Sequence, residues 1–112
     1  LLRVPEPADH IFHSYYKFFA FIRPERLKPG WDRDKIMDAI VNRGVPCFTG
    51  FCPEIYLEKA FAKAGYGPKH RLPVAKELGE TSLMFLVHPT LTTQEIDRTC
   101  EVVSSVCTQA TA

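Results

Sequence analysis

The sequence predicts a mixed α/β fold, an α+β layer in which a few strands are covered by helices. Three observations lead to this prediction. Aromatic, β-prone runs alternate with segments of helical periodicity, in the order strand, helix, strand, helix, helix, strand, helix. Proline and glycine separate these segments, and there is no internal repeat. The 112 residues are 46% apolar and 24% charged, which suffices for a single domain, residues 1–112, with one modest core.

The first predicted element is a long strand over residues 10–22, HIFHSYYKFFAFI, an aromatic and β-prone run. In a pleated strand, the odd-numbered residues from His13 to Phe21 share one face, and the even-numbered residues share the other. Both faces are largely apolar, which predicts burial on both sides of the strand. Residues 23–31, RPERLKPGW, then predict a connection because proline and glycine punctuate them.

A helix and a short strand are predicted next. Asp32 is a suitable N-cap for a helix that reaches Arg43 and has Gly44 just beyond its end. The predicted buried stripe of this helix consists of Ile36, Met37, Ile40 and Val41. Residues 45–51, VPCFTGF, predict a second strand, which is short and broken by Gly50.

Two proline-opened helices are predicted in the middle of the chain. Residues 53–65, PEIYLEKAFAKAG, have Pro53 in the first turn and Gly65 beyond the end, where these residues are favoured. Residues 66–71, YGPKHR, predict a loop. Residues 72–80, LPVAKELGE, predict the second of these helices.

The last two predicted elements are a buried strand and a long helix. The strand covers residues 81–89, TSLMFLVHP, and stops at Pro89. The helix covers residues 92–107, and its Thr92 and Glu95 match the T-x-x-E capping box. Its predicted buried stripe consists of Ile96, Cys100, Val103 and Cys107, flanked by Val102 and Val106.

Composition excludes several function classes. The net charge is +1, from 14 basic and 13 acidic residues, which gives no electrostatic footprint for nucleic acid or an anionic membrane. The longest nearly apolar stretch, residues 15–22, contains Lys17 and is too short to span a membrane. The start of the sequence lacks both a signal-peptide pattern and a methionine. We therefore expect a cytoplasmic protein and a chain that is a fragment of a longer one.

Metal chemistry is not expected. Cys47 and Cys52 lack CxxC spacing, and no pair of ligands follows at the distance typical of zinc sites. Cys100 and Cys107 lie seven apart in a predicted helix and are interpreted as small core residues. His10 and His13 would point to opposite faces of a strand, so they could not easily share a metal ion.

The residues alone do not identify a reaction. No nucleophile elbow and no glycine-rich phosphate loop is present. His13 and Tyr15, on one face of the first strand, are candidates to line a pocket; alternatively His13 only makes a hydrogen bond at a strand end. Glu54 and Glu58 lie four apart on a predicted helix, and they could serve acid–base chemistry or simply form a solvated face.

Three segments together resemble the C-terminal part of the DegT/DnrJ/EryC1/StrS sugar aminotransferases. They are GVPCFTGFCPEIYLEKAF at residues 44–61, LPVAKELGETSLMFLVHPTLTTQEID at residues 72–97, and ADHIFHSYYKF at residues 8–18. The second contains the Leu-Pro-x-Ala-x-x-Leu helix, the Leu-x-His-Pro-Thr-Leu turn and the Thr-x-x-Glu helix start typical of that family. The resemblance covers about residues 9–106, and its order and spacing are more specific than any single piece.

This resemblance implies the small C-terminal domain of a fold-type I pyridoxal-phosphate enzyme, with a small, mostly antiparallel sheet covered by helices. Such enzymes move an amino group from glutamate to a keto sugar, usually one linked to a nucleotide, and they act as homodimers. Their large N-terminal domain carries the Schiff-base lysine, the aspartate facing the pyridine nitrogen and the phosphate cup. None of these motifs is in this sequence, so we expect no catalytic residue, no bound cofactor and no transamination from this chain alone.

The resemblance also implies which residues line the substrate. Residues 48–56 would form the loop and helix start that face it, and this loop is less basic and more aromatic than is common in the family. The predicted substrate-binding residues are His13, Tyr15, Thr49, Glu54 and Tyr56. Glu54 and Tyr56 could bind sugar hydroxyls, or they could only pack the small helix. Two other hypotheses remain open: a free-standing α/β module that binds or senses a small ligand, and a purely structural interaction domain.

Overall fold

The computed structural model describes residues 1–50 and 52–112. It contains one antiparallel sheet of three strands in the order β1-β2-β3. The strands are β1 (Leu2–Arg3), β2 (Lys17–Ile22) and β3 (Ser82–Leu86). The helices are α1 (Arg33–Val41), α2 (Lys59–Ala64), α3 (Pro73–Thr81) and α4 (Thr93–Ala110), with short 3-10 turns η1 (Pro24–Arg26) and η2 (Ile55–Leu57). This architecture confirms the predicted mixed α/β class with an antiparallel sheet.

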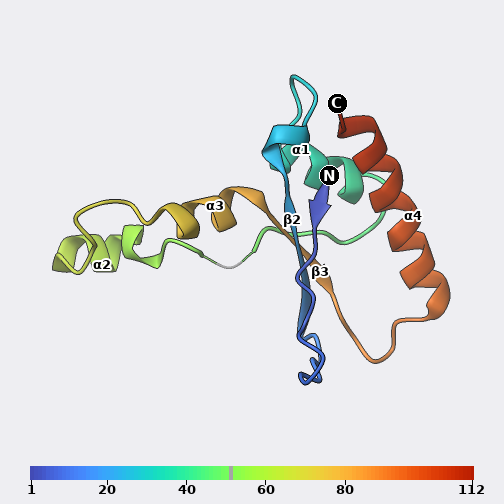
Figure 1. Ribbon diagram of the computed structural model, residues 1–112, viewed down its shortest axis with the longest axis horizontal. Coiled ribbons are helices and arrows are strands. Elements are labelled where there is room, and N and C mark those ends of the chain that lie inside the picture. Colours follow the sequence, from blue (N-terminus) through green and yellow to red (C-terminus); the bar gives the residue numbers. More distant parts are fainter. Residues whose placement is uncertain (51) are drawn as a thin grey trace.

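The core lies between one face of the sheet and helices α1 and α4 (Figure 1). Ala20 of β2 pairs with Leu83 of β3, and Phe18 pairs with Phe85, so these four side chains share one face. The buried core comprises Ala20, Ile22, Ile36, Ile40, Val45, Cys47, Leu83, Phe85, Val102, Val106 and Ala110. The chain ends lie close together beside this core, because Leu1 and Ala112 both hydrogen-bond to the segment around η1.

The long strand predicted over residues 10–22 is wrong in its first half. The strand begins only at Lys17, because Tyr15 has a left-handed backbone with φ of 48°, which cannot continue a pleat. The Tyr15 N–H donates instead to Nδ1 of His13 at 2.9 Å. Phe12 is 99% exposed and Tyr16 is 81% exposed, so burial on both faces does not extend to this segment.

Helix α1 confirms the prediction from Asp32. The Asp32 carboxylate accepts a hydrogen bond from the Lys35 N–H at 2.8 Å, which is the expected N-cap. Ile36 and Ile40 are fully buried, as predicted. Val41 was predicted in the same stripe but is 46% exposed, because it is the last residue of the helix and turns away from the core.

The strand predicted over residues 45–51 is reduced to one antiparallel bridge. Phe48 and Met84 exchange two backbone hydrogen bonds, at 3.0 and 2.8 Å. Val45 and Cys47 are buried under this edge of the sheet. Phe51, the last residue of the predicted strand, lies outside the described residues.

The helix predicted over residues 53–65 is divided. Turn η2 and helix α2 are separated at Glu58, whose ψ of 141° is extended rather than helical. The predicted helix end is confirmed, since Gly65 closes α2 with a left-handed φ of 72°. Helix α3 is confirmed with Pro73 in its first turn.

Helix α4 has the predicted capping box between Thr92 and Glu95. Its predicted buried stripe is only partly confirmed: Val103 packs against the core as a partly buried residue, but the core follows the predicted flanking residues Val102 and Val106 instead of Ile96 and Cys100. Val102, Val106 and Ala110, spaced four apart, are the residues buried against α1 and the sheet. Ile96 is 49% exposed and Cys100 is exposed, because the first half of α4 stands away from the sheet (Figure 1).

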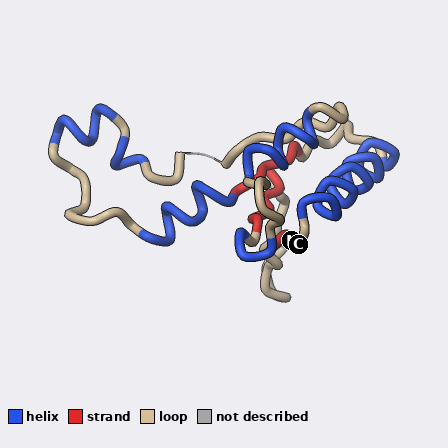
Figure 2. Tube along the Cα trace, turned by 90° about the horizontal axis from the view of Figure 1, so that it is seen from above, coloured by secondary structure: helices blue, strands red, loops and turns tan. Residues whose placement is uncertain are grey.

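The arm, which we define as residues 52–81, projects from the sheet on the side opposite α4 (Figures 1 and 2). It contains η2, α2 and α3. No residue of η2 or α2 is buried. The arm therefore cannot be held in place by a core of its own, and polar contacts at its base decide its position.

Candidate functional site

An ion pair closes the base of the arm. Glu54, the residue before η2, is buried, and Arg71 precedes α3. Arg71 donates from Nε to Oε1 of Glu54 at 2.7 Å and from Nη2 to Oε2 at 2.6 Å. This two-point geometry is the strongest that a guanidinium and a carboxylate can form.

Tyr56 extends this ion pair into a network. Its hydroxyl donates to Oε1 of Glu54 at 2.6 Å and accepts a hydrogen bond from the Leu72 N–H at 3.0 Å. We call the group formed by Glu54, Tyr56, Arg71 and the Leu72 N–H the clasp. It joins the first turn of the arm to the start of α3, and it encloses α2 and the loop between them.

The clasp shifts the pKa values of its members. The hydrogen bonds from Arg71 and then from Tyr56 hold the pKa of the Glu54 carboxyl below its usual value. Loss of water, together with the Glu54 carboxylate beside it, raises the pKa of Tyr56. At neutral pH the clasp therefore contains an ionised carboxylate, a cation and a neutral phenol.

Close packing also holds α3 against the start of the arm. A Cβ atom built on Gly79 would lie 2.3 Å from Cγ of Pro53, so only glycine allows this approach. Arg33 of α1 donates from Nη1 to the carbonyl oxygens of Gly79 and Ser82, at 3.2 and 3.1 Å. These contacts fix α3 to the body of the domain.

Thr49 is an exposed residue between the Phe48 bridge and the arm. The next residue, Gly50, donates its N–H to Oγ of Ser82 at 3.1 Å. A Cβ on Gly50 would lie only 2.6 Å from the same oxygen, so the backbone passes directly over the strand. The Thr49 side chain is thereby presented to solvent.

His13 and Tyr15, which were predicted to share one face of a strand and to line a pocket, are in contact through their rings, outside any strand. Their ring centroids lie 4.3 Å apart, and Tyr15 lies 5.7 Å from Phe18. This aromatic group belongs to the segment just before β2, whereas Glu54 and Tyr56 belong to the arm (Figure 1). The structure thus forms two separate pairs from the predicted residues.

Arg71 was missed by sequence reasoning, which assigned YGPKHR to an ordinary loop. The partner of Arg71 lies 17 residues away, so no helical or strand periodicity links the two. The idea that Glu54 and Glu58 share a helix face is wrong: they flank η2, and Glu58 accepts a hydrogen bond from Sγ of Cys52 at 3.3 Å.

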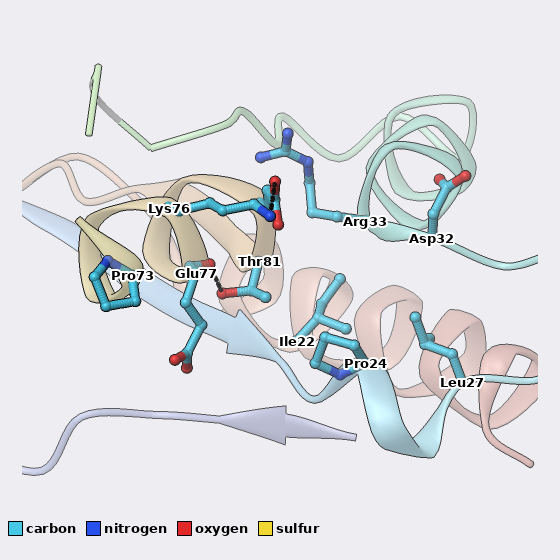
Figure 3. A pocket seen from close by; sticks show the side chains of 10 residues that line it. Ile22, Pro24, Leu27, Asp32, Arg33, Pro73, Lys76, Glu77 and Thr81 are labelled. Atoms are coloured by element: carbon cyan, nitrogen blue, oxygen red, sulfur yellow. Dashed lines mark hydrogen bonds and ion pairs between the residues drawn. The ribbon is translucent and has the colours of Figure 1, made fainter. Parts of the chain in front are cut away.

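A cavity of about 450 Å³ lies behind the arm, between α1, α3 and the end of β2 (Figure 3). Its charged groups mostly have partners already. Lys76 lies 3.8 Å from Glu80, and Asp32 caps α1. The hydroxyl of Thr81 donates to the carbonyl oxygen of Glu77 at 2.7 Å. We interpret this cavity as the space between the arm and the body of the domain rather than as a reaction site.

Within residues 1–50 and 52–112, no group of three potential metal-binding side chains (His, Cys, Asp or Glu) is found. Burial raises the pKa of the Cys47 thiol to about 11, so Cys47 is a protonated core residue at neutral pH. Cys100, predicted as a core residue, is exposed instead. None of the helices in the described part of the chain is long and apolar enough to cross a membrane.

Solved aminotransferases share this structure. The chain is similar to the aminotransferase from Psychrobacter cryohalolentis, with a TM-score of 0.91 and 46% identity over 97% of this chain and 29% of that chain. The aminotransferase TlmJ from Streptoalloteichus hindustanus has a TM-score of 0.76 and 23% identity over 96% of this chain and 26% of its own. A DegT DnrJ EryC1 StrS aminotransferase from Brucella abortus has a TM-score of 0.74 and 19% identity, over 93% and 26%.

These comparisons relate the chain to part of a longer protein. It spans 29% of the Psychrobacter aminotransferase and 26% of each of the other two. A search of curated proteins found no match. The DegT/DnrJ/EryC1/StrS aminotransferase family matches residues 2–104, a range that includes both the His13 segment and the clasp. The chain therefore belongs to the DegT/DnrJ/EryC1/StrS aminotransferase family.

Proposed function

We propose that the chain is the small C-terminal domain of a cytoplasmic, homodimeric, pyridoxal-phosphate-dependent aminotransferase. In this proposal the longer protein moves an amino group from glutamate to a keto sugar that is linked to a nucleotide, and residues 48–56 form one wall of its active site. The match to only 29% of the Psychrobacter aminotransferase supports a domain of a longer protein. Family membership supports the transferase activity.

The chain's own residues do not suit pyridoxal phosphate. Six of its seven lysines are exposed, and Lys17 is half-buried at the start of β2. Lys76 and Lys28 are engaged, with Glu80 and with the Gln109 carbonyl oxygen. An activated lysine is normally desolvated, and a phosphate needs a cradle of backbone N–H groups. We therefore assign the cofactor to the remainder of the longer protein and derive no chemical step on it from this chain.

The clasp is the observation that carries the proposed substrate wall. Within residues 1–50 and 52–112, Oε2 of Glu54 accepts a single bond, from Arg71, which leaves it able to accept another. Half of the Arg71 side chain is exposed, so its guanidinium remains accessible. A carboxylate acceptor beside a guanidinium donor matches neighbouring hydroxyls of a sugar. Tyr56 already donates to Glu54 and accepts from Leu72, so its main role is to position Glu54.

Glu54→Gln in the longer protein tests this role. The amide keeps the shape of the side chain but loses the charge that anchors Arg71 and accepts the sugar hydroxyl. We expect the KM for the keto-sugar acceptor to rise about tenfold or more, since one hydrogen bond to a charged group contributes about 1.5–3 kcal/mol. The KM for glutamate should be unchanged. Release of 2-oxoglutarate from glutamate, followed with a panel of free and nucleotide-linked keto sugars, measures both constants.

Glu58→Gln is the matched control, because Glu58 is an exposed carboxylate of the same arm. It should leave both KM values unchanged. Thr49→Ala and His13→Ala test two other predicted substrate-binding residues in the same assay. If Glu54→Gln leaves every acceptor's kinetics unchanged while the arm stays folded, the substrate wall does not include Glu54. If no keto sugar is aminated by the unmodified protein, the proposed substrate class is wrong.

A further inference from the structure

Positive charge is concentrated at the outer end of the arm. We define residues 59–71 as the tip, which consists of α2 and the loop that leads to α3 (Figures 1 and 2). Four of the 14 basic residues of the chain lie in the tip, whereas all 13 acidic residues lie elsewhere. The four are Lys59, Lys63, Lys69 and Arg71, and every residue of the tip is exposed. The net charge of the whole chain therefore does not reflect this local basic region.

Three of these four cations have no acidic partner. Arg71 is paired with Glu54 in the clasp. Within residues 1–50 and 52–112, none of Lys59, Lys63 and Lys69 forms an ion pair. Lys59 and Lys63 are four apart in α2, so their ammonium groups share one face of the helix and repel each other. Because α2 buries no residue that would offset this repulsion, an anion bound at the tip would stabilise it.

An exposed aromatic ring accompanies these charges. Tyr66 follows the glycine that ends α2, and it is 79% exposed. The Tyr66 N–H donates to the carbonyl oxygen of Phe61 at 3.2 Å, which holds Tyr66 at the end of the helix, three residues after Lys63. Exposed rings next to cations are typical of nucleotide-binding surfaces, where bases stack on the rings and phosphates lie beside the cations.

The tip also lies beside the clasp. A Cβ atom built on Gly67 would lie 3.8 Å from the carbonyl oxygen of Tyr56, so the chain returns to the clasp directly after Tyr66. The clasp is the proposed site of the sugar, and a group attached to that sugar could therefore extend over the tip. The cations are confined to residues 59–71, which suits a compact anion better than a long nucleic acid.

We propose that the tip binds the nucleoside diphosphate of the nucleotide-linked keto sugar, with Lys63 and Lys69 beside the phosphates and Tyr66 stacked on the base. The inference rests on the proposed function, and it identifies the residues that distinguish a nucleotide-linked sugar from a free one. A lysine ammonium binds phosphate as a point charge, without the cradle of backbone N–H groups that a resident cofactor needs. Such exposed contacts also allow the aminated product to leave.

Calorimetric titration of the longer protein tests the inference without relying on turnover. The probes are UDP, dTDP and GDP, and inorganic pyrophosphate serves as a diphosphate without a nucleoside. We expect at least one nucleotide to bind and Tyr66→Ala to raise its Kd about fivefold or more, because the stacked base is lost. Tyr66→Phe keeps the ring and should bind like the unmodified protein. The Kd for pyrophosphate should be the same in both Tyr66 variants.

Lys63→Ala and Lys69→Ala test the phosphate contacts. Each should raise the Kd for the nucleotide and for pyrophosphate by a similar factor, about twofold to fivefold, as expected for one exposed charge pair. The difference should shrink as the salt concentration rises.

Two matched controls lie outside the arm. Tyr16→Ala removes a ring that is 81% exposed, and Lys35→Ala removes an exposed lysine of α1. Both should leave every Kd unchanged, and circular dichroism verifies that each variant is folded.

Unchanged Kd values in Tyr66→Ala and in both tip lysine variants would overturn the inference, and so would a protein that binds none of the three nucleotides. Weaker binding in the lysine variants alone would mean that the tip attracts anions without contacting the base, which overturns the nucleoside assignment. Amination of a nucleotide-linked keto sugar with the same KM in all tip variants would leave the proposed function standing while this inference fails. A protein that binds nucleotide at the tip but aminates no keto sugar would contradict the proposed function alone.

Discussion

Arg71 donates two hydrogen bonds to the carboxylate of Glu54, at 2.7 and 2.6 Å, although the two residues are 17 apart in the sequence. This contact joins the residue before η2 to the segment before α3. The Tyr56 hydroxyl bridges the same two parts of the chain through Glu54 and the Leu72 N–H. Because α2 buries no residue of its own, the clasp determines where residues 54–72 lie.

Arg71→Lys should loosen the arm without unfolding the domain. An ammonium group can approach one carboxylate oxygen but cannot reproduce the two-point geometry of a guanidinium. We expect amide hydrogen exchange to accelerate at least about threefold in residues 54–72, while exchange in β2 and β3 stays unchanged. Mass spectrometry of peptides from the exchanged chain measures both regions.

Arg98→Lys provides the control for the same chemical change, since the contact of Arg98 with Glu101 on the surface of α4 is a loose one, at 4.0 Å. The Arg98→Lys substitution should leave amide hydrogen exchange unchanged throughout the chain. Equal exchange in the arm of the Arg71→Lys and unmodified chains would show that packing, rather than the clasp, holds the arm.

The clasp should also open in acid. Arg71 and Tyr56 lower the pKa of Glu54 in the folded chain relative to the unfolded chain. The contribution of Glu54 is therefore complete above its unfolded pKa, about 4.3, and it is lost as the pH falls through the lower folded pKa. We expect the protection of residues 54–72, corrected for the intrinsic exchange rate, to be constant from pH 7 to about 5 and to fall below about pH 4.

Glu54→Gln should make the protection of this segment independent of pH over the same range, because the amide does not titrate. An NMR titration of the Glu54 side-chain carboxyl gives the folded pKa itself. A folded pKa at or above the value in the unfolded chain would contradict the charge assignment of the clasp.

Gly79→Ala should have two opposing effects, one on the stability of α3 and one on its contact with Pro53. Alanine inside α3, in its last turn, should favour the helix by about 0.5–1 kcal/mol. Its Cβ, however, would lie 2.3 Å from the Pro53 ring, which must then move. We expect the displacement to dominate locally, so that exchange accelerates around residues 52–56 while the helicity measured by circular dichroism is kept.

Gly67→Ala is a suitable control, because the nearest atom to its Cβ would lie at an ordinary 3.8 Å. It should leave exchange around Pro53 unchanged. If Gly79→Ala stabilises the whole chain and leaves the arm as protected as before, the contact between α3 and Pro53 is adaptable rather than fixed.

Features set by neighbouring residues could be predicted from the sequence. The Asp32 cap and the Thr92–Glu95 capping box depend on atoms three residues apart, and both are present. The start of β2 could not be found in this way. Aromatic content favoured a strand through Tyr15, but a local bond to His13 holds Tyr15 in a left-handed conformation instead.

The candidate site likewise combines residues that are close together in the sequence with one from a distant segment. Glu54 and Tyr56 were predicted through a family resemblance, and they lie together because they are two residues apart at the start of η2. Arg71 completes the site from a segment with no periodic signal, so only the tertiary fold could reveal it. The buried face of α4 was similarly ambiguous, since its sequence offers two adjacent apolar stripes and the position of α1 selects one.

The choice between these two stripes can be measured by two substitutions in the 112-residue chain. Val106 is fully buried against α1 and the sheet, so Val106→Ala should lower the free energy of unfolding by about 1–3 kcal/mol. Ile96 is 49% exposed, so Ile96→Ala should cost less than about 1 kcal/mol, although it removes more carbon. Urea denaturation followed by circular dichroism gives both values. If Ile96→Ala were the more costly substitution, α4 would present to the core the stripe that its sequence first suggested.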